Sequence, residues 1–482
     1  MMDSQRKRQT GWSVIRKPGF AKRTPSAPFF AAPTKIRRMN WRRFLFWSLL
    51  MLLLTPAGGA QAEPGPGIEH WETENGLKVY FMAAPALPML DLRVIFRAGS
   101  ARDGDQPGLA RLTNGLLKAG AGEWDADTIA ERFESVGAQY DADALRDMAF
   151  LSLRGLTEPD WLERALATFT TVLGQPRFFQ RDLERARRQT LVALEAEAQR
   201  PGSVAQRLFF EAVFGEHPYA SSPLGTSESV GAISREQVQA FHRELYVARN
   251  GVLVLVGGVS REQAEDIAAQ VAAALPEGRP AAPLPEVKPV EEARTIRVPF
   301  PSEQAHVFMG QTGMRRGDPD YFPLYVGNHM LGGSSLTSLL FEEVRSSRGL
   351  AYSVHSSFVP MEVEGPFVMG VQTQAAQADE AIQVMRDTLV RFRDRGPDRA
   401  QLQASRRNII GGFPLRIASN RDMVGNLAMM GFYGLPLDYL HTYSDYVESV
   451  SAKGIRDAFQ RRLDPERLIT VIVGGETELV LP

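Results

Sequence analysis

Few side chains in this 482-residue sequence belong to the types that build a self-contained hydrolytic site. There is no cysteine, which excludes disulfides, thiolate zinc sites and a cysteine nucleophile. No G-x-S-x-G motif marks a nucleophilic serine. The seven histidines include no pair four residues apart, so no two share a helix face as zinc ligands would. We expect those after His70 to be surface or packed residues: His217, His242, His306, His329, His355 and His441.

A second group of candidate residues lies in segment 331–354, where L-G-G-S-S-L leads to F-E-E-V-R-S-S-R-G-L-A-Y. Arg345 and Tyr352 form an R-x6-Y pattern in this segment. An arginine can bind carbonyl or carboxylate oxygens with its planar fork. A tyrosine hydroxyl can donate a hydrogen bond to an oxygen that gains negative charge. In isolation such a pair is usually a solvated helix-end charge and an amphipathic strand residue, so its meaning depends on the surrounding architecture.

An internal repeat predicts that architecture. Each half of the sequence contains an alternating, strand-like run, 149–155 and 367–373, followed by an amphipathic helix. The apolar positions of the two helices match at a constant offset of 216: Leu166, Phe169 and Leu173 against Ile382, Met385 and Leu389. Near its end each half also has an apolar strand closed by glycines, 252–258 and 468–475. These matches indicate two copies of one structural unit.

We therefore predict an α+β fold of two homologous lobes, each a mostly antiparallel sheet packed with helices, arranged as a clamshell. The first lobe spans residues 66–274 and the second spans 293–482. Segment 275–292 between them contains five prolines, which favour extended backbone, so we predict a semi-rigid linker. Capping boxes at Ser234 and Ser260 predict the starts of two helices, and Gly137 suits a left-handed helix end.

The start of the sequence is strongly basic, with twelve Lys or Arg and one acid in residues 1–43. Arg42 and Arg43 precede an apolar run of about eleven residues and an A-x-A site that ends at Ala62, the layout of a secretory signal peptide. A membrane anchor is the alternative, but a spanning helix needs about 20 apolar residues. We predict that residues 1–62 are a leader, of which residues 1–38 are an over-extended start before Met39.

Removal of this leader would leave an acidic chain, which argues against nucleic-acid binding. We expect an exported, periplasmic protein that meets the membrane only transiently, through its signal peptide.

The sequence after residue 66 resembles the insulinase/pitrilysin family of zinc peptidases. In that family the first helix of the first lobe carries H-x-x-E-H, in which two histidines hold zinc from one helix face and the glutamate is the general base. The corresponding segment here is G-L-A-R-L-T-N-G-L-L, residues 108–117. It places Arg111 and Gly115 at the histidine positions and Asn114 at the glutamate position. The family's distal zinc-binding glutamate falls near Val192, with Glu195 the nearest acid.

None of the three degenerate positions keeps the chemistry of a zinc site. The arginine repels a cation, the glycine offers no ligand, and the asparagine cannot act as a base. The conclusion does not depend on the alignment, because no histidine occurs between His70 and His217. We expect this chain to bind no zinc and no other cofactor.

The second lobe keeps more of the family pattern. The resemblance implies that its R-x6-Y pair faces the zinc across the cavity, which assigns that role to Arg345 and Tyr352, with Arg348 as a competitor for the arginine. It implies a non-metal subunit of a heterodimeric zinc metallopeptidase, inactive alone, which supplies this pair in trans to bind peptide and stabilise the oxyanion. The partner would be a homologous subunit with an intact H-x-x-E-H motif and the zinc, and the substrates would be peptides.

Two other functions stay open at this point. A scaffold or assembly subunit of a larger complex would not need Arg345 or Tyr352. A self-sufficient hydrolase would need residues that the sequence does not reveal.

Overall fold

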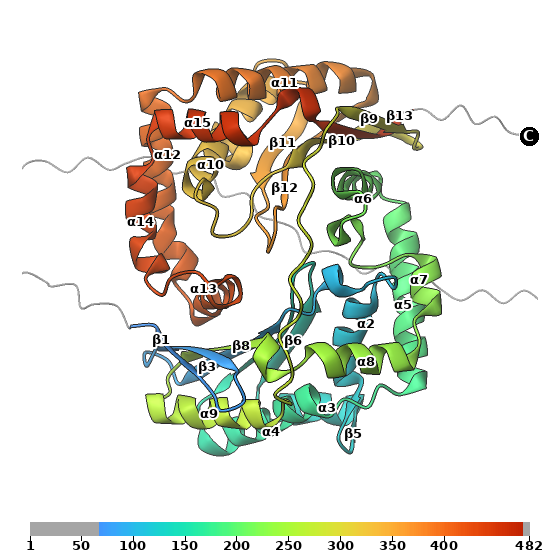
Figure 1. The fold of residues 1–482 in the computed structure, drawn as a ribbon, viewed down its shortest axis with the longest axis vertical. Coiled ribbons are helices and arrows are strands. Elements are labelled where there is room, and N and C mark those ends of the chain that lie inside the picture. Colours follow the sequence, from blue (N-terminus) through green and yellow to red (C-terminus); the bar gives the residue numbers. More distant parts are fainter. Residues whose placement is uncertain (1–66, 476–482) are drawn as a thin grey trace, which may run out of the picture. The chain divides into compact units, whose positions relative to one another are not determined.

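The computed structural model describes residues 67–475, and all of them belong to one compact unit (Figure 1). The predicted leader, residues 1–62, lies outside the described residues. No helix within 67–475 combines the length and the apolar character that a bilayer-spanning segment requires.

The N-terminal half builds a six-stranded sheet in the order β1-β2-β8-β3-β7-β6. Only the β2–β8 pair is parallel, and the other neighbours are antiparallel. The strands are β1 (Glu69–Glu72), β2 (Lys78–Ala83), β3 (Met89–Phe96), β6 (Gln139–Ala144), β7 (Ala149–Leu156) and β8 (Gly251–Gly257). A separate two-stranded ribbon joins β4 (Gly120–Ala121) and β5 (Trp124–Asp125).

The C-terminal half builds a five-stranded sheet in the order β11-β12-β10-β13-β9, in which only β13–β9 is parallel. Its strands are β9 (Arg294–Val298), β10 (Ser302–Thr312), β11 (Ala351–Phe358), β12 (Pro366–Gln374) and β13 (Ile469–Gly475). Read from the parallel edge, β9-β13-β10-β12-β11 repeats β2-β8-β3-β7-β6 strand for strand. The predicted α+β fold of two homologous lobes is confirmed.

Helices surround both sheets (Figure 1). In the N-terminal half they are α2 (Leu109–Leu116), α3 (Ala126–Glu134), α4 (Pro159–Gly174), α5 (Gln180–Ala198), α6 (Pro201–Phe214), α7 (Ser227–Ala232), α8 (Arg235–Leu245) and α9 (Arg261–Ala273). In the C-terminal half they are α10 (Tyr321–Asn328), α11 (Ala378–Arg395), α12 (Arg399–Gly412), α13 (Asn420–Tyr433), α14 (Tyr439–Ser449) and α15 (Ala452–Arg462). The capping boxes predicted at Ser234 and Ser260 begin α8 and α9, and Gly137 has a φ of 64°.

The two halves exchange one helix each. The apolar face of α6, which includes Phe209, packs with Phe308 of β10 and Val471 of β13 in the C-terminal sheet. The apolar face of α13, which includes Leu427, packs against strands β2, β3 and β8 of the N-terminal sheet. Each sheet therefore has its own helices on one face and a helix from the other half on the opposite face.

This exchange explains the uniformly apolar strands that close each half. Every residue of β8 is buried, and alternate residues belong to different cores: Leu253 packs with the helices of its own half, and Val254 packs with α13. A strand that is covered on both faces has no solvent side, so its sequence does not alternate.

The proline-rich segment between the halves has neither helix nor strand, and it is tied to the first half by side chains. The backbone N–H of Ala281 donates to Asn250 Oδ1 at 2.9 Å, and Arg102 donates to the carbonyl of Ala282 at 2.6 Å. His217 lies 3.1 Å from the carbonyl of Pro285. These contacts hold the segment against the first lobe up to residue 285.

Candidate functional site

The structure brings Arg345 and Tyr352 together. Arg345 lies in a π-helical segment, Phe341–Ser346, that leads into β11, and Tyr352 is the second residue of that strand. The guanidinium carbon of Arg345 lies 4.5 Å from the ring centre of Tyr352 and 4.8 Å from that of Phe341. A cation over an aromatic ring is stabilised by about 0.5–1 kcal/mol at an exposed site. The predicted pair is therefore one physical unit.

A β-bulge turns Tyr352 toward solvent. Ala351 pairs with Thr373 and Ser353 pairs with Gln372 in β12, so Tyr352 has no partner across the ladder. A bulge re-aims the side chain that it carries, and here the side chain of Tyr352 is 81% exposed. Within residues 67–475 its hydroxyl makes no hydrogen bond. An exposed, unengaged phenol at the open edge of a sheet is available to a molecule outside the chain.

Arg348, the competing arginine, is engaged elsewhere. Its guanidinium donates to the carboxylate of Glu343 at 2.6 Å and to the carbonyl of the same residue at 2.7 Å. Arg391 binds the other carboxylate oxygen of Glu343 at 2.7 Å. Arg345, by contrast, has no ion pair among the described residues. The geometry favours Arg345 as the arginine that can meet a ligand.

The degenerate positions Arg111, Asn114 and Gly115 lie on α2 as the alignment predicts. Arg111 is exposed and forms an ion pair with Asp143 of β6 at 3.2 Å. Asn114 is buried, and its amide donates to the carbonyl of Phe150 at 3.3 Å and to the hydroxyl of Tyr246 at 3.2 Å. Gly115 is exposed, and no atom of the described residues lies within 4 Å of the Cβ that any other residue would place there.

These positions line a cavity of about 320 Å³ between α2, α5 and β6. Its α5 wall is formed by Ala186, Gln189, Thr190 and Ala193. Val192 and Glu195 of the same helix are exposed and do not line it. The distal ligand position, predicted near Val192, therefore lies on a different face of α5. Counting residues along the chain does not determine which residues of α5 face the cavity.

The zinc that the resemblance implies does not fit this cavity. Its only ionisable side chains are Arg111 and Asp143, which bind each other, and the rest of its lining offers no imidazole. Across residues 67–475 no three His, Cys, Asp or Glu side chains come together in a way that could hold a metal ion. No step of a mechanism in this chain runs through a metal at α2.

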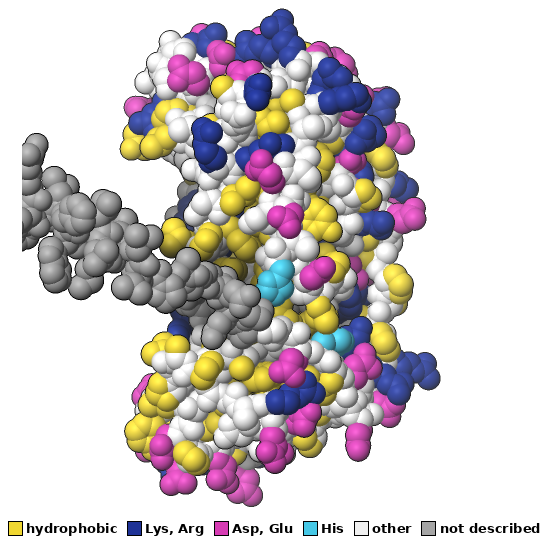
Figure 2. Space-filling model, turned by 90° about the vertical axis from the view of Figure 1, so that its left-hand side faces the viewer, with side chains coloured by type: hydrophobic (Ala, Val, Ile, Leu, Met, Phe, Trp, Pro, Cys, Tyr) yellow, Lys and Arg dark blue, Asp and Glu magenta, His cyan; other side chains and the backbone are white. Residues whose placement is uncertain are grey.

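Two of the histidines after His70 form hydrogen bonds with neighbouring structural groups. His242 binds the carbonyl of Leu173 at 3.0 Å, and His329 binds the side chain of Asn408 at 3.0 Å. Figure 2 shows histidine side chains on the face that it draws, among basic and acidic side chains that are largely interspersed.

Two neighbours of the candidate residues were not predicted. Phe341 stacks on Arg345 from four residues earlier, a spacing that brings side chains together on a helix and could have been noticed in the sequence. Asp143 pairs with Arg111 across the cavity, and because the two are distant in sequence, only the fold reveals the contact.

Comparison with known proteins identifies relatives of both halves. The family model for insulinase, peptidase family M16, matches residues 82–227, and the model for the peptidase M16 inactive domain matches residues 232–409. A relative from Helicobacter pylori, described as the non-peptidase homolog YmxG, is 25% identical over 89% of this chain and 98% of its own length. The uncharacterized zinc protease YmxG of Bacillus subtilis is 23% identical over 73% of this chain and 85% of its own.

Solved structures agree with the fold. The crystal structure of a peptidase M16 inactive domain from Pseudomonas fluorescens superimposes with a TM-score of 0.83 and 38% sequence identity, over 85% of this chain and 98% of that one. A protease from Helicobacter pylori superimposes with a TM-score of 0.78 over 85% of this chain and 99% of that one. Its sequence identity is 17%, so it supports the fold alone.

Proposed function

Because this chain belongs to peptidase family M16, the insulinase family, and is an inactive homologue within it, we propose that it is the non-metal subunit of a heterodimeric zinc metallopeptidase. In this proposal a homologous partner with an intact H-x-x-E-H motif holds the zinc. This chain supplies Arg345 and Tyr352 in trans to the peptide that the partner cleaves. The observation that carries the proposal is the contrast between the two lobes: α2 lacks every zinc ligand, whereas the arginine–tyrosine pair is intact and free.

The chemistry of the pair fits a substrate-binding role. When a peptide bond is attacked, negative charge develops on its carbonyl oxygen, and a hydroxyl donor aimed at that oxygen stabilises the charge. Tyr352 can donate in this way because its side chain is exposed and its hydroxyl has no hydrogen-bond partner among residues 67–475. Arg345 can bind a neighbouring peptide carbonyl through its fork, and its contact with the Tyr352 ring keeps the two groups adjacent.

The position of the pair supports action on a second chain. Tyr352 lies near the start of β11, which is the edge strand of the C-terminal sheet. The side chain is exposed in the single chain, and its ring contacts Arg345 of the same lobe. An oxyanion donor works in a water-excluded site, so the surface that completes this site must come from another molecule.

The proposal extends to location and partners. The basic segment, apolar run and A-x-A site of residues 1–62 support export to the periplasm, with membrane contact only through the signal peptide. Peptides are the proposed substrates, and we propose no nucleic-acid partner.

The isolated and the combined subunits provide the test. The purified chain alone is expected to contain no stoichiometric zinc and to cleave no peptide. Co-expression with an exported family M16 subunit from the same genome that has H-x-x-E-H should give a complex with zinc and with chelator-sensitive peptidase activity. Zinc bound tightly to the lone chain, together with proteolysis that a chelator stops, would contradict the proposal.

Variants of the second lobe distinguish the proposal from a scaffold. Arg345→Ala should lower kcat/KM of the pair at least about ten-fold, because an arginine bound to substrate oxygens makes a charge-assisted hydrogen bond. Arg348→Ala is the matched control, since this arginine binds Glu343 instead, and it should leave kcat/KM within about two-fold. If both variants form the complex and keep full activity, the scaffold is the better description.

A further inference from the structure

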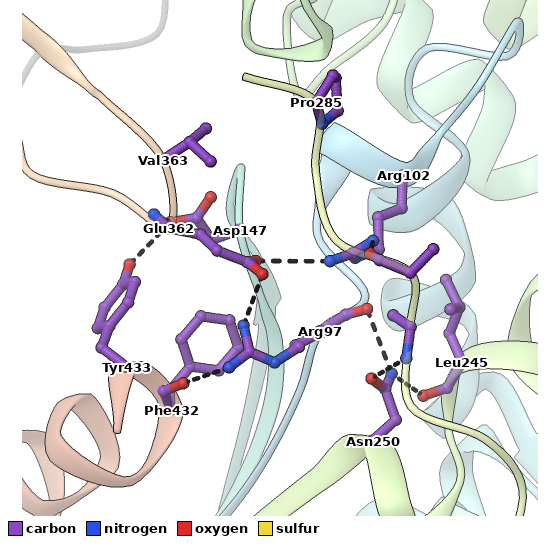
Figure 3. Close-up of polar contacts among 12 residues, drawn as sticks. Arg97, Arg102, Asp147, Leu245, Asn250, Pro285, Glu362, Val363, Phe432 and Tyr433 are labelled. Carbon is purple, nitrogen blue, oxygen red and sulfur yellow. Dashed lines mark hydrogen bonds and ion pairs between the residues drawn. The ribbon is translucent and has the colours of Figure 1, made fainter. Parts of the chain in front are cut away.

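Both exchanged helices are connected to one buried carboxylate. Asp147, in the turn between β6 and β7, is only 3% exposed. Its Oδ1 accepts a hydrogen bond from the hydroxyl of Tyr219 at 2.5 Å. Its Oδ2 accepts hydrogen bonds from the hydroxyl of Tyr433 and from the backbone N–H of Glu362, each at 2.8 Å, and Figure 3 shows Asp147 between these two residues. Tyr433 is the last residue of α13, and Tyr219 follows five residues after the end of α6.

The third donor to Asp147, the backbone N–H of Glu362, belongs to the turn between β11 and β12. This hydrogen bond therefore connects Asp147 to the hairpin that contains Tyr352. In that turn the backbone N–H of Val363 also donates to the hydroxyl of Tyr219, at 3.3 Å. The Glu362 side chain forms ion pairs with Arg97 at 2.8 Å and with Arg102 at 3.5 Å, both of which follow β3 of the first lobe (Figure 3). One cluster therefore joins the first lobe, both exchanged helices and the edge hairpin of the second lobe.

The physical chemistry of this cluster favours a single arrangement of the lobes. A buried carboxylate that loses its donors keeps the cost of its own desolvation, so partial opening is strongly unfavourable. Burial first, and the Asp147 charge second, raise the pKa of both Tyr219 and Tyr433 above the ordinary value. Both hydroxyls are therefore protonated donors at neutral pH.

Close packing supports the same conclusion. A Cβ on Gly431 of α13 would lie 2.7 Å from Tyr80 and from Val252 in the first lobe, and a Cβ on Gly310 of β10 would lie 3.0 Å from Phe209 of α6. The exchanged helices are therefore seated directly on the sheets that they cover. An opening motion would have to separate a close-packed interface and unpair the carboxylate together.

We propose that Asp147 is the latch that holds the two lobes of this chain in one arrangement, so that the isolated chain does not open and close as a clamshell. If the proposed function holds, a further consequence follows: peptide enters through the face shared with the partner, and Asp147 is a positioning residue for the strand that carries Tyr352. The latch itself can be tested without a partner.

The absence of cysteine allows a direct measurement of lobe separation. Glu163 on α4 and Glu380 on α11 are exposed, lie on the equivalent helices of the two lobes, and can be replaced by a cysteine pair for spin labels. Double electron–electron resonance on the isolated chain should give one narrow distance distribution. A broad or bimodal distribution in this background would overturn the proposal, because the lobes would then open with the latch intact.

Variants of the latch complete the test in the same labelled background. Asp147→Ala should add a population at longer distance, and Tyr433→Phe and Glu362→Gln, which are milder, should each broaden the distribution. Tyr140→Phe is the matched control, since the buried hydroxyl of Tyr140 has no hydrogen-bond partner in the part of the chain that the structure describes. This variant should leave the distance distribution unchanged. Circular dichroism checks that Tyr433→Phe and Glu362→Gln are folded. If both folded variants keep the original distance distribution, Asp147 is not a latch, and this outcome does not depend on the proposed partner.

Discussion

Three residues on α2 determine what the first lobe of this protein can do. Arg111, Asn114 and Gly115 stand where family M16 zinc peptidases carry two histidines and a catalytic glutamate. Gly115 leaves its part of the cavity empty, and Arg111 neutralises the one carboxylate nearby, Asp143. The backbone of the site is kept, because α2 still lies against α5 and β6, and only the side-chain chemistry has changed.

This interpretation predicts that zinc affinity can be restored at α2. Arg111→His combined with Gly115→His would place two imidazoles one helical turn apart on the cavity face, with the carboxylate of Asp143 released from its ion pair. We expect the double variant to bind zinc in a competition titration, and Arg111→His alone to bind far more weakly. If the folded double variant shows no more affinity than the wild type, α2 does not present these two positions as a metal site would.

At the scale of elements, helix α8 places a histidine where charge is unfavourable. His242 stacks on Tyr246 with ring centres 4.9 Å apart and bonds to the carbonyl of Leu173. Burial lowers the pKa of His242 to about 4. The neutral ring is therefore the form that the folded protein accommodates.

The sign of the resulting pH dependence follows from linkage. In the unfolded chain His242 takes up a proton near its ordinary pKa, whereas the folded protein resists protonation down to about pH 4. The contribution of the neutral His242 ring to the free energy of unfolding is fully present above about pH 6.5. It is lost as the pH falls toward about 4, by up to about 1.4 kcal/mol per pH unit. Urea unfolding at about pH 7 and about pH 5 measures this effect. Between these two pH values the free energy of unfolding of His242→Gln should fall by about 2 kcal/mol less than that of the wild type. Equal losses would show that the ring is protonated in the folded protein.

The exchanged helix α13 offers a prediction with an internal control. Gly431 faces the first-lobe sheet so closely that a Cβ would overlap Tyr80, whereas a Cβ on Gly425 of the same helix meets nothing within 4 Å. Gly425→Ala should stabilise the protein by about 0.5–1 kcal/mol through helix propensity. Gly431→Ala should destabilise it by about 1–3 kcal/mol through overpacking. Chemical unfolding measures both, and equal effects of the same sign would contradict the packing described here.

Several strands and helix starts could be predicted from the sequence, but not which surfaces the helices cover. The repeat predicted two copies of one sheet, and the capping boxes at Ser234 and Ser260 predicted two helix starts, because both signals are local. The exchange of α6 and α13 could not be predicted, since an amphipathic pattern shows which face of a helix is apolar and not which sheet it meets. The bulge at Tyr352 was not predictable either, because it depends on the register with β12.

At the scale of the whole molecule, the proposed function makes this chain one part of a composite site. Residues 67–475 form two lobes held by exchanged helices. In the second lobe the half-buried Arg345 contacts the exposed Tyr352 near the start of the edge strand β11. A protein that works without a partner chain would have no use for an exposed Tyr352 at the edge of its sheet. It is explained if a second, zinc-bearing chain covers it.

A titration of this chain into a fixed amount of the zinc-bearing partner tests that claim most directly, with peptide hydrolysis as the readout. With wild-type protein, activity should rise and saturate at the stoichiometry of the complex. Tyr352→Phe should reach saturation at the same ratio but at a plateau about a hundred-fold lower, because one donor to the developing oxyanion is lost while docking is kept. An equal plateau for Tyr352→Phe, or full activity of the partner before any of this chain is added, would contradict the account.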